Sequence, residues 1–132
     1  MNKITLLSLT PSSKNFYQMM GQFAMDKSIV KEFDGYPITT EQDWNWLIAM
    51  DKDKPVGFLS YKLDEESADL KFLYTTPSLR RKGVCSKLYA QFKKETKKSA
   101  LSATATKDGK AFLEKQGWSV EKPFVKWYKM SA

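Results

Sequence analysis

A cationic run between an apolar segment and a helix-like segment is the part of this chain best suited to chemistry. Residues 70–75 are rich in apolar and aromatic side chains, Pro77 ends that segment, and the run Arg80–Lys82 precedes Gly83. This order predicts a strand, a basic turn and the first turn of a helix. Backbone N–H groups at a helix start lack intrahelical partners, and the helix dipole adds about half a positive charge there. We therefore expect the turn to bind an anion such as a polyphosphate.

The charge of the chain is divided unequally between its two halves. Residues 1–70 carry 7 Lys and 11 Asp or Glu, a net charge of −4, whereas residues 71–132 carry 15 Lys or Arg and 4 Asp or Glu, a net charge of +11. This division favours an anionic partner for the second half and a cationic one for the first. Four lysines of the second half, within 93–98, are better interpreted as the solvated face of an amphipathic helix. They nevertheless keep nucleic acid open as a partner.

Composition restricts the chemistry that the chain can perform. Its 132 residues are expected to form one domain, 1–132, and an aromatic content of 14% is typical of a globular protein. One cysteine and no histidine exclude a disulfide within the chain and argue against a metal site. A general base would therefore be a carboxylate, a tyrosine, a lysine, water or a terminus. The apolar N-terminal segment is too short for a signal peptide and no run approaches a membrane span, so we expect a cytoplasmic protein.

Periodicity along the chain predicts an alternation of strands and helices. The expected strands are 4–9, 46–50, 55–63, 68–75, 101–104, 118–120 and 124–130. The expected helices are 16–23, 28–33, 83–97 and 107–116, with a helical turn over 40–44. Ser12 or Ser13 is the expected cap of the first helix.

Three segments carry a resemblance to a known family. The spacing Arg80-x-x-Gly83-x-Cys85 resembles the Arg/Gln-x-x-Gly-x-Gly/Ala signature of the GNAT N-acetyltransferases, which grip the pyrophosphate of acetyl-CoA. Residues 46–61 resemble the central hairpin of that family, and residues 111–118 its second acetyl-CoA segment. The resemblance implies an α+β fold (an α/β sandwich), namely a single GNAT-type domain. Its central sheet would be mixed but mostly antiparallel, with about seven strands flanked by helices.

The function implied by the resemblance is transfer of an acetyl group from acetyl-CoA, the acyl-donor co-substrate, to an amine of a small molecule or a protein. The implied protein is a monomer or homodimer that needs no metal and no membrane. Two alternatives remain. The basic half of the chain allows a nucleic-acid-directed acyltransferase, and departures from the family pattern allow a non-catalytic acetyl-CoA-binding module on the same fold.

The resemblance also implies a set of donor-binding residues. The backbone of Leu73 and Thr75 would pair with the pantetheine arm, and the amides from Arg81 to Ser86 would cradle the pyrophosphate. The full set is Leu73, Tyr74, Thr75, Arg80, Arg81, Lys82, Gly83, Val84, Cys85, Ser86 and Thr106.

Three positions depart from the family pattern. Cys85 stands where the family has Gly or Ala, and we interpret it as a small residue that fits rather than as a thiol with a lowered pKa. Leu113 stands where many members have a tyrosine that protonates the departing thiolate, and leucine cannot donate a proton. Thr106 stands at the position of a common CoA-contacting Asn.

The acceptor side is less well specified by the sequence. Glu32 and Asp34 are the candidate bases that could attract and deprotonate an ammonium group, and Asp69 is a further candidate farther from the thioester. Tyr36 and the tryptophans of the same regions could contact the acceptor. The four tryptophans, Trp44, Trp46, Trp118 and Trp127, are more typical of a hydrophobic core than of a stacking platform.

Overall fold

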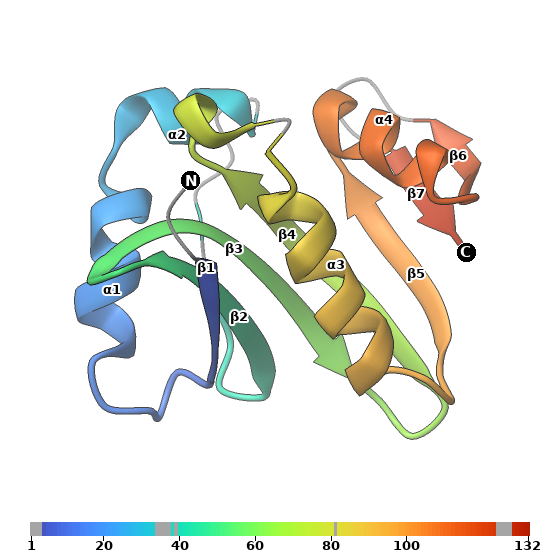
Figure 1. The fold of residues 1–132 in the computed structure, drawn as a ribbon. Helices are drawn as coiled ribbons and strands as arrows, with labels where there is room; N and C mark the ends of the chain where they lie inside the picture. Colours follow the sequence, from blue (N-terminus) through green and yellow to red (C-terminus); the bar gives the residue numbers. More distant parts are fainter. Residues whose placement is uncertain (1–3, 34–37, 39, 81, 124–127) are drawn as a thin grey trace.

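A single seven-stranded sheet with helices on both faces forms the protein (Figure 1). The computed structural model describes residues 4–33, 38, 40–80, 82–123 and 128–132. The strands are β1 (Ile4–Leu9), β2 (Trp44–Asp51), β3 (Lys54–Leu63), β4 (Ser67–Thr75), β5 (Ala100–Ala105), β6 (Ser119–Pro123) and β7 (Tyr128–Ser131). The helices are α1 (Phe16–Ala24), α2 (Lys27–Glu32), α3 (Val84–Glu95) and α4 (Lys107–Lys115), with a short 3₁₀ turn, η1 (Pro77–Leu79).

The sheet topology confirms the expected fold class. The strand order is β1-β2-β3-β4-β5-β7-β6, and β4 with β5 is the parallel pair among antiparallel ones. Helix α3 connects β4 to β5, as a parallel pair requires a crossover. Apart from the helical turn over 40–44, the expected order of strands and helices is correct for the described residues, and most predicted bounds differ from the observed ones by a few residues. Residues 124–127 of the last expected strand lie outside the described residues.

Two local predictions at the N-terminal side are wrong. Trp44, predicted in a helical turn, opens β2 opposite Lys62 of β3, because the ten-residue β3 is long enough to pair with it. The expected serine cap of α1 is also wrong: Asn15, in the left-handed region at φ 71°, is the N-cap. The Ser13 hydroxyl instead accepts a hydrogen bond from the Thr10 N–H, at 2.9 Å, within the preceding turn.

Two hydrophobic clusters cover the two faces of the sheet. Under α3 and α4 lies a mainly aliphatic cluster, whose centre is made by Leu59, Leu88 and Leu113. Under α1 and α2 lies a mainly aromatic cluster, whose centre is made by Phe58 and the rings around it. Phe58 and Leu59 are neighbours on β3 and point to opposite faces, as alternation along a strand requires.

The close approach of β3 to β4 depends on a glycine. Gly57 lies opposite Thr75, and a Cβ atom at Gly57 would stand 2.8 Å from the Tyr74 carbonyl oxygen, well inside van der Waals contact. The end of β4 is thereby held against β3, with a further hydrogen bond of 2.8 Å from the Thr76 N–H to the Val56 carbonyl.

Candidate donor-binding site

The edge of β4 that faces β5 is open over its last residues. The two strands pair only from Ser67↔Ala100 to Leu70↔Ala103, although β4 continues to Thr75 and β5 to Ala105. Figure 1 shows them diverging toward the top of the view, beside the start of α3. Because the Thr76 N–H points to β3, alternation along the strand turns the N–H and C=O groups of Leu73 and Thr75 toward the gap. The gap therefore presents the N–H and C=O groups of Leu73 and the N–H of Thr75 to an extended ligand, whereas the Thr75 carbonyl already accepts a hydrogen bond from the Arg80 Nε–H.

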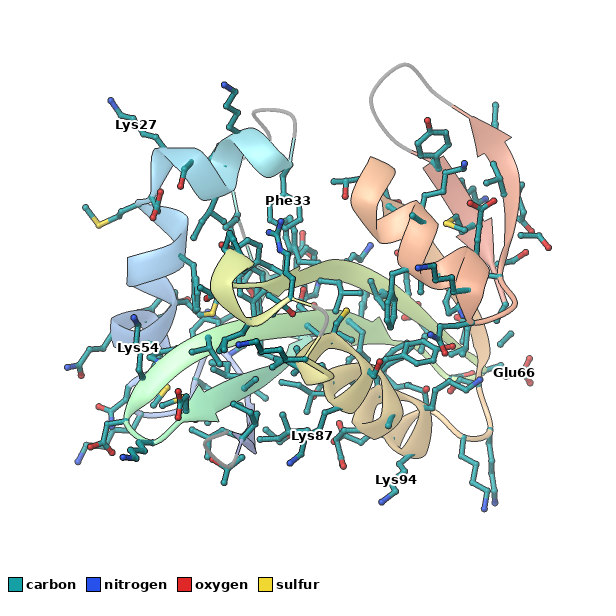
Figure 2. All side chains as sticks on the ribbon, turned by 45° about the horizontal axis from the view of Figure 1, so that its top comes forward. Lys27, Phe33, Lys54, Glu66, Lys87 and Lys94 are labelled. Atoms are coloured by element: carbon teal, nitrogen blue, oxygen red, sulfur yellow. The ribbon has the colours of Figure 1, made fainter. Side chains whose placement is uncertain are left out.

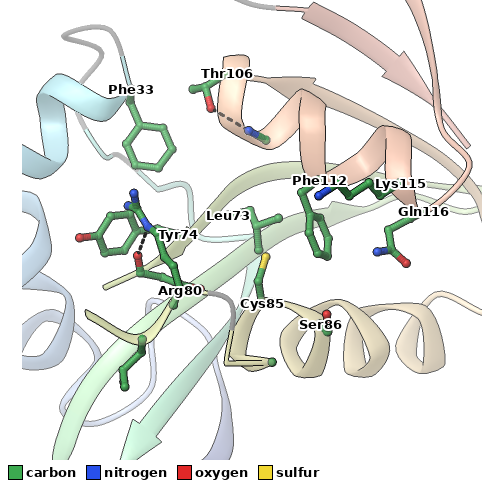
Figure 3. A pocket seen from close by; sticks show the side chains of 14 residues that line it. Phe33, Leu73, Tyr74, Arg80, Cys85, Ser86, Thr106, Phe112, Lys115 and Gln116 are labelled. Carbon is green, nitrogen blue, oxygen red and sulfur yellow. Dashed lines mark hydrogen bonds between the residues drawn. The ribbon is translucent and has the colours of Figure 1, made fainter. Parts of the chain in front are cut away.

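A cavity of about 480 Å³ opens at this gap. It is bounded by the end of β4, the start of α3, and α4. The residues that line it are Phe33, Leu73, Tyr74, Thr75, Leu79, Arg80, Gly83, Cys85, Ser86, Thr106, Gly109, Phe112, Lys115 and Gln116. Figure 3 shows the close-up, with Cys85 and Ser86 on one wall and Phe112, Lys115 and Gln116 on the other. The volume is in the range of small-molecule and cofactor sites.

The first turn of α3 supplies backbone donors to one end of the cavity. Gly83 is the N-cap with φ 85°, a left-handed conformation that favours glycine, and as a glycine it has no side chain to cap the helix. The first helical bond that follows runs from the Lys87 N–H to the Gly83 carbonyl, at 3.0 Å. By helix geometry the N–H groups of Val84, Cys85 and Ser86 have no partner within α3. They are available to an anion.

Eight of the eleven expected donor-binding residues line the cavity: Leu73, Tyr74, Thr75, Arg80, Gly83, Cys85, Ser86 and Thr106. Lys82 is exposed at the turn but is not part of the lining. Val84 is buried in the aliphatic cluster, so only its backbone can reach a ligand. Arg81 lies outside the described residues.

Burial keeps the Cys85 thiol protonated. Desolvation raises the pKa of Cys85 to about 11, against an ordinary value of 9.0. The Thr75 hydroxyl and the Arg80 charge lower this pKa by smaller amounts, the hydroxyl without the geometry of a full hydrogen bond. The interpretation of Cys85 as a small residue that fits is thus supported, because a reactive thiol needs a lowered pKa.

Thr75 and Thr106 place hydroxyl groups on the cavity wall. The Thr75 side chain is only 6% exposed, and its hydroxyl has no hydrogen-bond partner among the described residues. Thr106 is the N-cap of α4, where its hydroxyl accepts a hydrogen bond of 3.3 Å from the Gly109 N–H. The Thr106 oxygen therefore organises α4 while lining the cavity.

Sequence reasoning missed six lining residues: Phe33, Leu79, Gly109, Phe112, Lys115 and Gln116. Three of them lie in the segment 111–118, which resembles the second acetyl-CoA segment of the family and in which the sequence points to Leu113. The Leu113 side chain is fully buried in the aliphatic cluster, whereas its neighbour Phe112 faces the cavity. The helical period alone does not say which of two adjacent apolar residues faces a ligand.

The candidate bases do not come together at the described part of the cavity. The side chain of Glu32, and all of Asp34 and Tyr36, lie outside the described residues. Asp69 is four residues before Leu73 on β4, about 13 Å along the strand. Its carboxylate instead forms an ion pair with Lys71 and accepts a hydrogen bond of 3.0 Å from the Ser102 hydroxyl.

Two of the tryptophans are core residues, as expected. Trp46 and Trp118 are almost fully buried, and the Trp118 Nε1–H donates to the Tyr89 hydroxyl at 2.8 Å. Trp44 is half-buried against the aromatic cluster, and Trp127 lies outside the described residues.

No helix in the described ranges has the length and apolar character to cross a membrane. The same residues contain no cluster of three or more Cys, Asp and Glu placed to hold a metal ion.

Comparison with known proteins identifies relatives of this fold. The sequence model of a family described as an acetyltransferase (GNAT) domain matches residues 24–126. A search of the curated proteins gives no match. Among solved structures, an acetyltransferase from Thermus thermophilus aligns with a TM-score of 0.76 at 18% identity, over 98% of this chain and 95% of the other.

Two further structures carry more specific descriptions. The PaiA N-acetyltransferase of Thermoplasma acidophilum, in complex with coenzyme A, aligns with a TM-score of 0.74 at 17% identity, over 96% of this chain and 98% of its own. The ribosomal-protein-S18-alanine N-acetyltransferase of Escherichia coli aligns with a TM-score of 0.72 at 12% identity, over 98% of this chain and 90% of its own. At these identities the structural likeness shows the fold.

Proposed function

The chain belongs to the GNAT acetyltransferase family, as an N-acetyltransferase, and on that premise we propose that its cavity binds acetyl-CoA and transfers the acetyl group to an amine. The observation that carries the proposal is the open edge of β4 beside the uncapped start of α3. An extended amide-containing arm fits the first, and a pyrophosphate fits the second. A cytoplasmic location and a monomeric or homodimeric state are part of this proposal, the former because acetyl-CoA is available there.

The donor would lie along three groups of atoms. Backbone groups of Leu73 and Thr75 would pair with the pantetheine arm, as a further strand pairs with a sheet edge. The N–H groups from Val84 to Ser86 would hold the pyrophosphate, with Lys82 adding charge from the exposed turn. Gly83 would let the backbone approach the phosphates, since a Cβ at this position would point into open space.

The proposed reaction requires the amine of the acceptor to be held next to the thioester of acetyl-CoA. The amine nitrogen attacks the thioester carbonyl carbon, a C–N bond forms as the C–S bond breaks, and the proton of the nitrogen passes to a base or to water. The coenzyme A thiolate leaves and takes a proton from solvent or from a donor. Holding the two reactants together supplies most of the rate enhancement. A base, for which Glu32 and Asp34 are the proposed candidates, adds about 10²–10⁴-fold.

The acceptor would approach the end of the cavity lined by Phe33 and Tyr74, and we propose an amine of a small molecule or a protein. A second candidate function is acetyl-CoA binding without transfer. It is favoured by Leu113, whose buried aliphatic side chain cannot protonate a thiolate. Release of free thiol from acetyl-CoA in the presence of a panel of amines separates the two functions.

The direct test of the donor is thermal stability with acetyl-CoA. A ligand that binds only the native state at a hundred times its dissociation constant raises the free energy of unfolding by roughly 2.7 kcal/mol. Gly83→Val is expected to abolish this stabilisation, because the side chain would occupy the space of the pyrophosphate. Gly117→Val is a matched control: Gly117 also has a positive φ, of 95°, and a Cβ there also meets nothing within 4 Å, but it does not line the cavity.

Both valine variants should lose similar stability from backbone strain, while only Gly117→Val keeps the stabilisation by acetyl-CoA. An unchanged melting curve of the parent protein at millimolar acetyl-CoA would contradict the proposed function. Equal loss of the ligand effect in both variants would contradict the assignment of the pyrophosphate to the Gly83 turn.

A further inference from the structure

Arg80 occupies a different part of the cavity from the one that its place in the basic turn suggests. Its Nε–H donates a hydrogen bond of 2.9 Å to the Thr75 carbonyl, and its guanidinium carbon lies 5.5 Å from the centre of the Tyr74 ring. Figure 3 shows the guanidinium beside Tyr74, on the side of Phe33 and away from Ser86. The charge therefore lies at the end of β4 and not at the start of α3.

The titration of Cys85 is consistent with this position. Arg80 and Cys85 both line the cavity, and the Arg80 charge lowers the pKa of Cys85 by less than desolvation raises it. Cys85 points from α3 toward Leu73 of β4 in Figure 3. The pKa of Cys85 therefore depends on the Arg80 charge and can be used to detect its removal.

The carbonyl that Arg80 contacts is on the open edge of β4. Beyond Leu70 this strand is paired with β3 on one side, and β5 has turned away on the other. The Thr75 carbonyl faces the gap, where no strand of the described residues pairs with it. A guanidinium donor to a carbonyl is a charge-assisted hydrogen bond, which is shorter and stronger than a neutral one. Arg80 therefore supports the strand end from the unpaired side.

We propose that Arg80 is a positioning residue for the pantetheine arm of the donor and not a ligand of its pyrophosphate. By fixing the Thr75 carbonyl it keeps the end of β4 extended, so that the arm pairs with an edge that is already ordered. A preordered edge binds more tightly because less conformational entropy is lost on binding. The inference rests on the proposed function and deepens it, because it assigns Arg80 of the basic turn to the pantetheine arm of acetyl-CoA and not to the pyrophosphate.

The test separates the two halves of acetyl-CoA. ADP carries a nucleotide and a pyrophosphate but no pantetheine, so it reports on the pyrophosphate site alone. Affinities for acetyl-CoA and ADP are measured by calorimetry for the parent, Arg80→Met, Arg80→Gln and Lys82→Met. Methionine keeps the apolar length of the side chain without a donor, and glutamine restores an N–H donor without the charge. Lys82→Met is the matched control, because Lys82 is the neighbouring exposed cation of the turn.

Arg80→Met is expected to weaken acetyl-CoA binding about tenfold, because without the Arg80–Thr75 hydrogen bond the end of β4 must be ordered when the pantetheine arm binds. ADP affinity should stay within about twofold of the parent, because ADP does not contact this strand end. Arg80→Gln should recover acetyl-CoA affinity to within about threefold of the parent. Lys82→Met should weaken both ligands in parallel. Alkylation of Cys85 across a pH series should show a higher pKa in both Arg80 variants, because both lack the cation.

A parallel loss of ADP affinity in Arg80→Met, or an Arg80→Gln variant as weak as Arg80→Met, would overturn the inference while leaving the proposed function intact. An unchanged pKa of Cys85 in both variants would overturn the placement of the charge. If Arg80→Met does not fold, Arg80→Gln alone decides: it must keep acetyl-CoA affinity while the pKa of Cys85 rises. A parent protein that binds ADP but not acetyl-CoA, or neither, contradicts the proposed function itself and this inference with it.

Discussion

The two faces of the sheet are packed with different kinds of side chain, and each face positions a different part of the site. The face under α3 and α4 is packed mainly with aliphatic side chains. On this face, the first turn of α3 and the side of α4 that faces it line the cavity. The face under α1 and α2 is packed with aromatic rings, such as Phe23 and Trp46 in contact with Phe58. The cavity lies at the end of β4, where adjacent residues of the strand point to opposite faces: Leu73 packs with the aliphatic cluster and Tyr74 with the aromatic one.

This difference between the two faces indicates how each of the two substrates would be recognised. On the aliphatic face the proposed donor-binding groups are mainly backbone atoms, and Gly83 at the start of α3 leaves them accessible. Such a site tolerates side-chain changes and suits a donor common to a family. On the aromatic face the cavity wall is made of ring surfaces, whose shape depends on every neighbour in the cluster. Such a wall suits a substrate that differs from one family member to another.

The largest expected effect tests the unequal packing of the faces. Phe58→Ala should lower the free energy of unfolding by about 3–5 kcal/mol, because a fully buried ring in contact with several others is removed. Leu59, the adjacent and equally buried residue on the other face, has a smaller side chain, so Leu59→Ala should cost less than Phe58→Ala, within the range of about 2–5 kcal/mol. Urea unfolding of both variants measures the difference. A larger loss for Leu59→Ala would reverse the comparison.

A smaller effect is expected for Leu113→Tyr on the aliphatic face. Because Leu113 is fully buried, the larger ring must force its neighbours apart, and the variant should lose about 1–3 kcal/mol of unfolding free energy. We expect acetyl transfer to change by no more than about tenfold, equivalent to about 1.4 kcal/mol in the barrier, since a thiolate leaves without protonation. Free-thiol release under saturating acetyl-CoA measures it. A gain of a hundredfold would instead favour the binding module as the natural function.

The pH dependence of stability should report the half-buried thiol of Cys85 on the same face. The folded-state pKa of Cys85, about 11, lies above its ordinary value of 9.0, so the folded protein holds a proton that the unfolded chain releases between these values. Stability is therefore complete below pH 9 and falls as the pH rises toward 11. Cys85→Ala should lose less stability over this interval in thermal melts. An identical slope in parent and variant would show that Cys85 does not titrate in this way.

The smallest expected effect concerns the lysines at the far end of α3. Lys93 and Lys94 lie about 14–15 Å along the helix from Val84, beyond the Debye length of about 8–10 Å, and Figure 2 shows Lys94 projecting outward. Charge reversal of Lys93, Lys94, Lys97 and Lys98 should leave acetyl-CoA affinity within about twofold of the parent, whereas Lys82→Glu at the turn should weaken it. Salt-dependent retention on nucleic acid that the reversal eliminates would favour the nucleic-acid-directed alternative.

Local patterns in the sequence were sufficient for the elements and for the donor turn. The alternation of apolar residues located β1 with its bounds, and Gly83 after three cations located the start of α3. Both depend on neighbours along the chain, because strand and helix periods and helix caps are local properties. For the same reason eight of the expected donor residues were found at the cavity. The expected cap at Ser12 or Ser13 failed because Ser13 is used by the preceding turn.

Other features of the site arise from contacts between segments that are distant in the sequence. The divergence of β4 from β5, the burial of Leu113 beside an accessible Phe112, and the raised pKa of Cys85 all arise where separate elements pack together. The contact of Arg80 with the Thr75 carbonyl spans only five residues, yet its meaning depends on the absence of β5 from that edge of the strand. Sequence thus determined which groups the chain offers, and packing determined which of them face the ligand, because burial and strand pairing are set by non-local contacts.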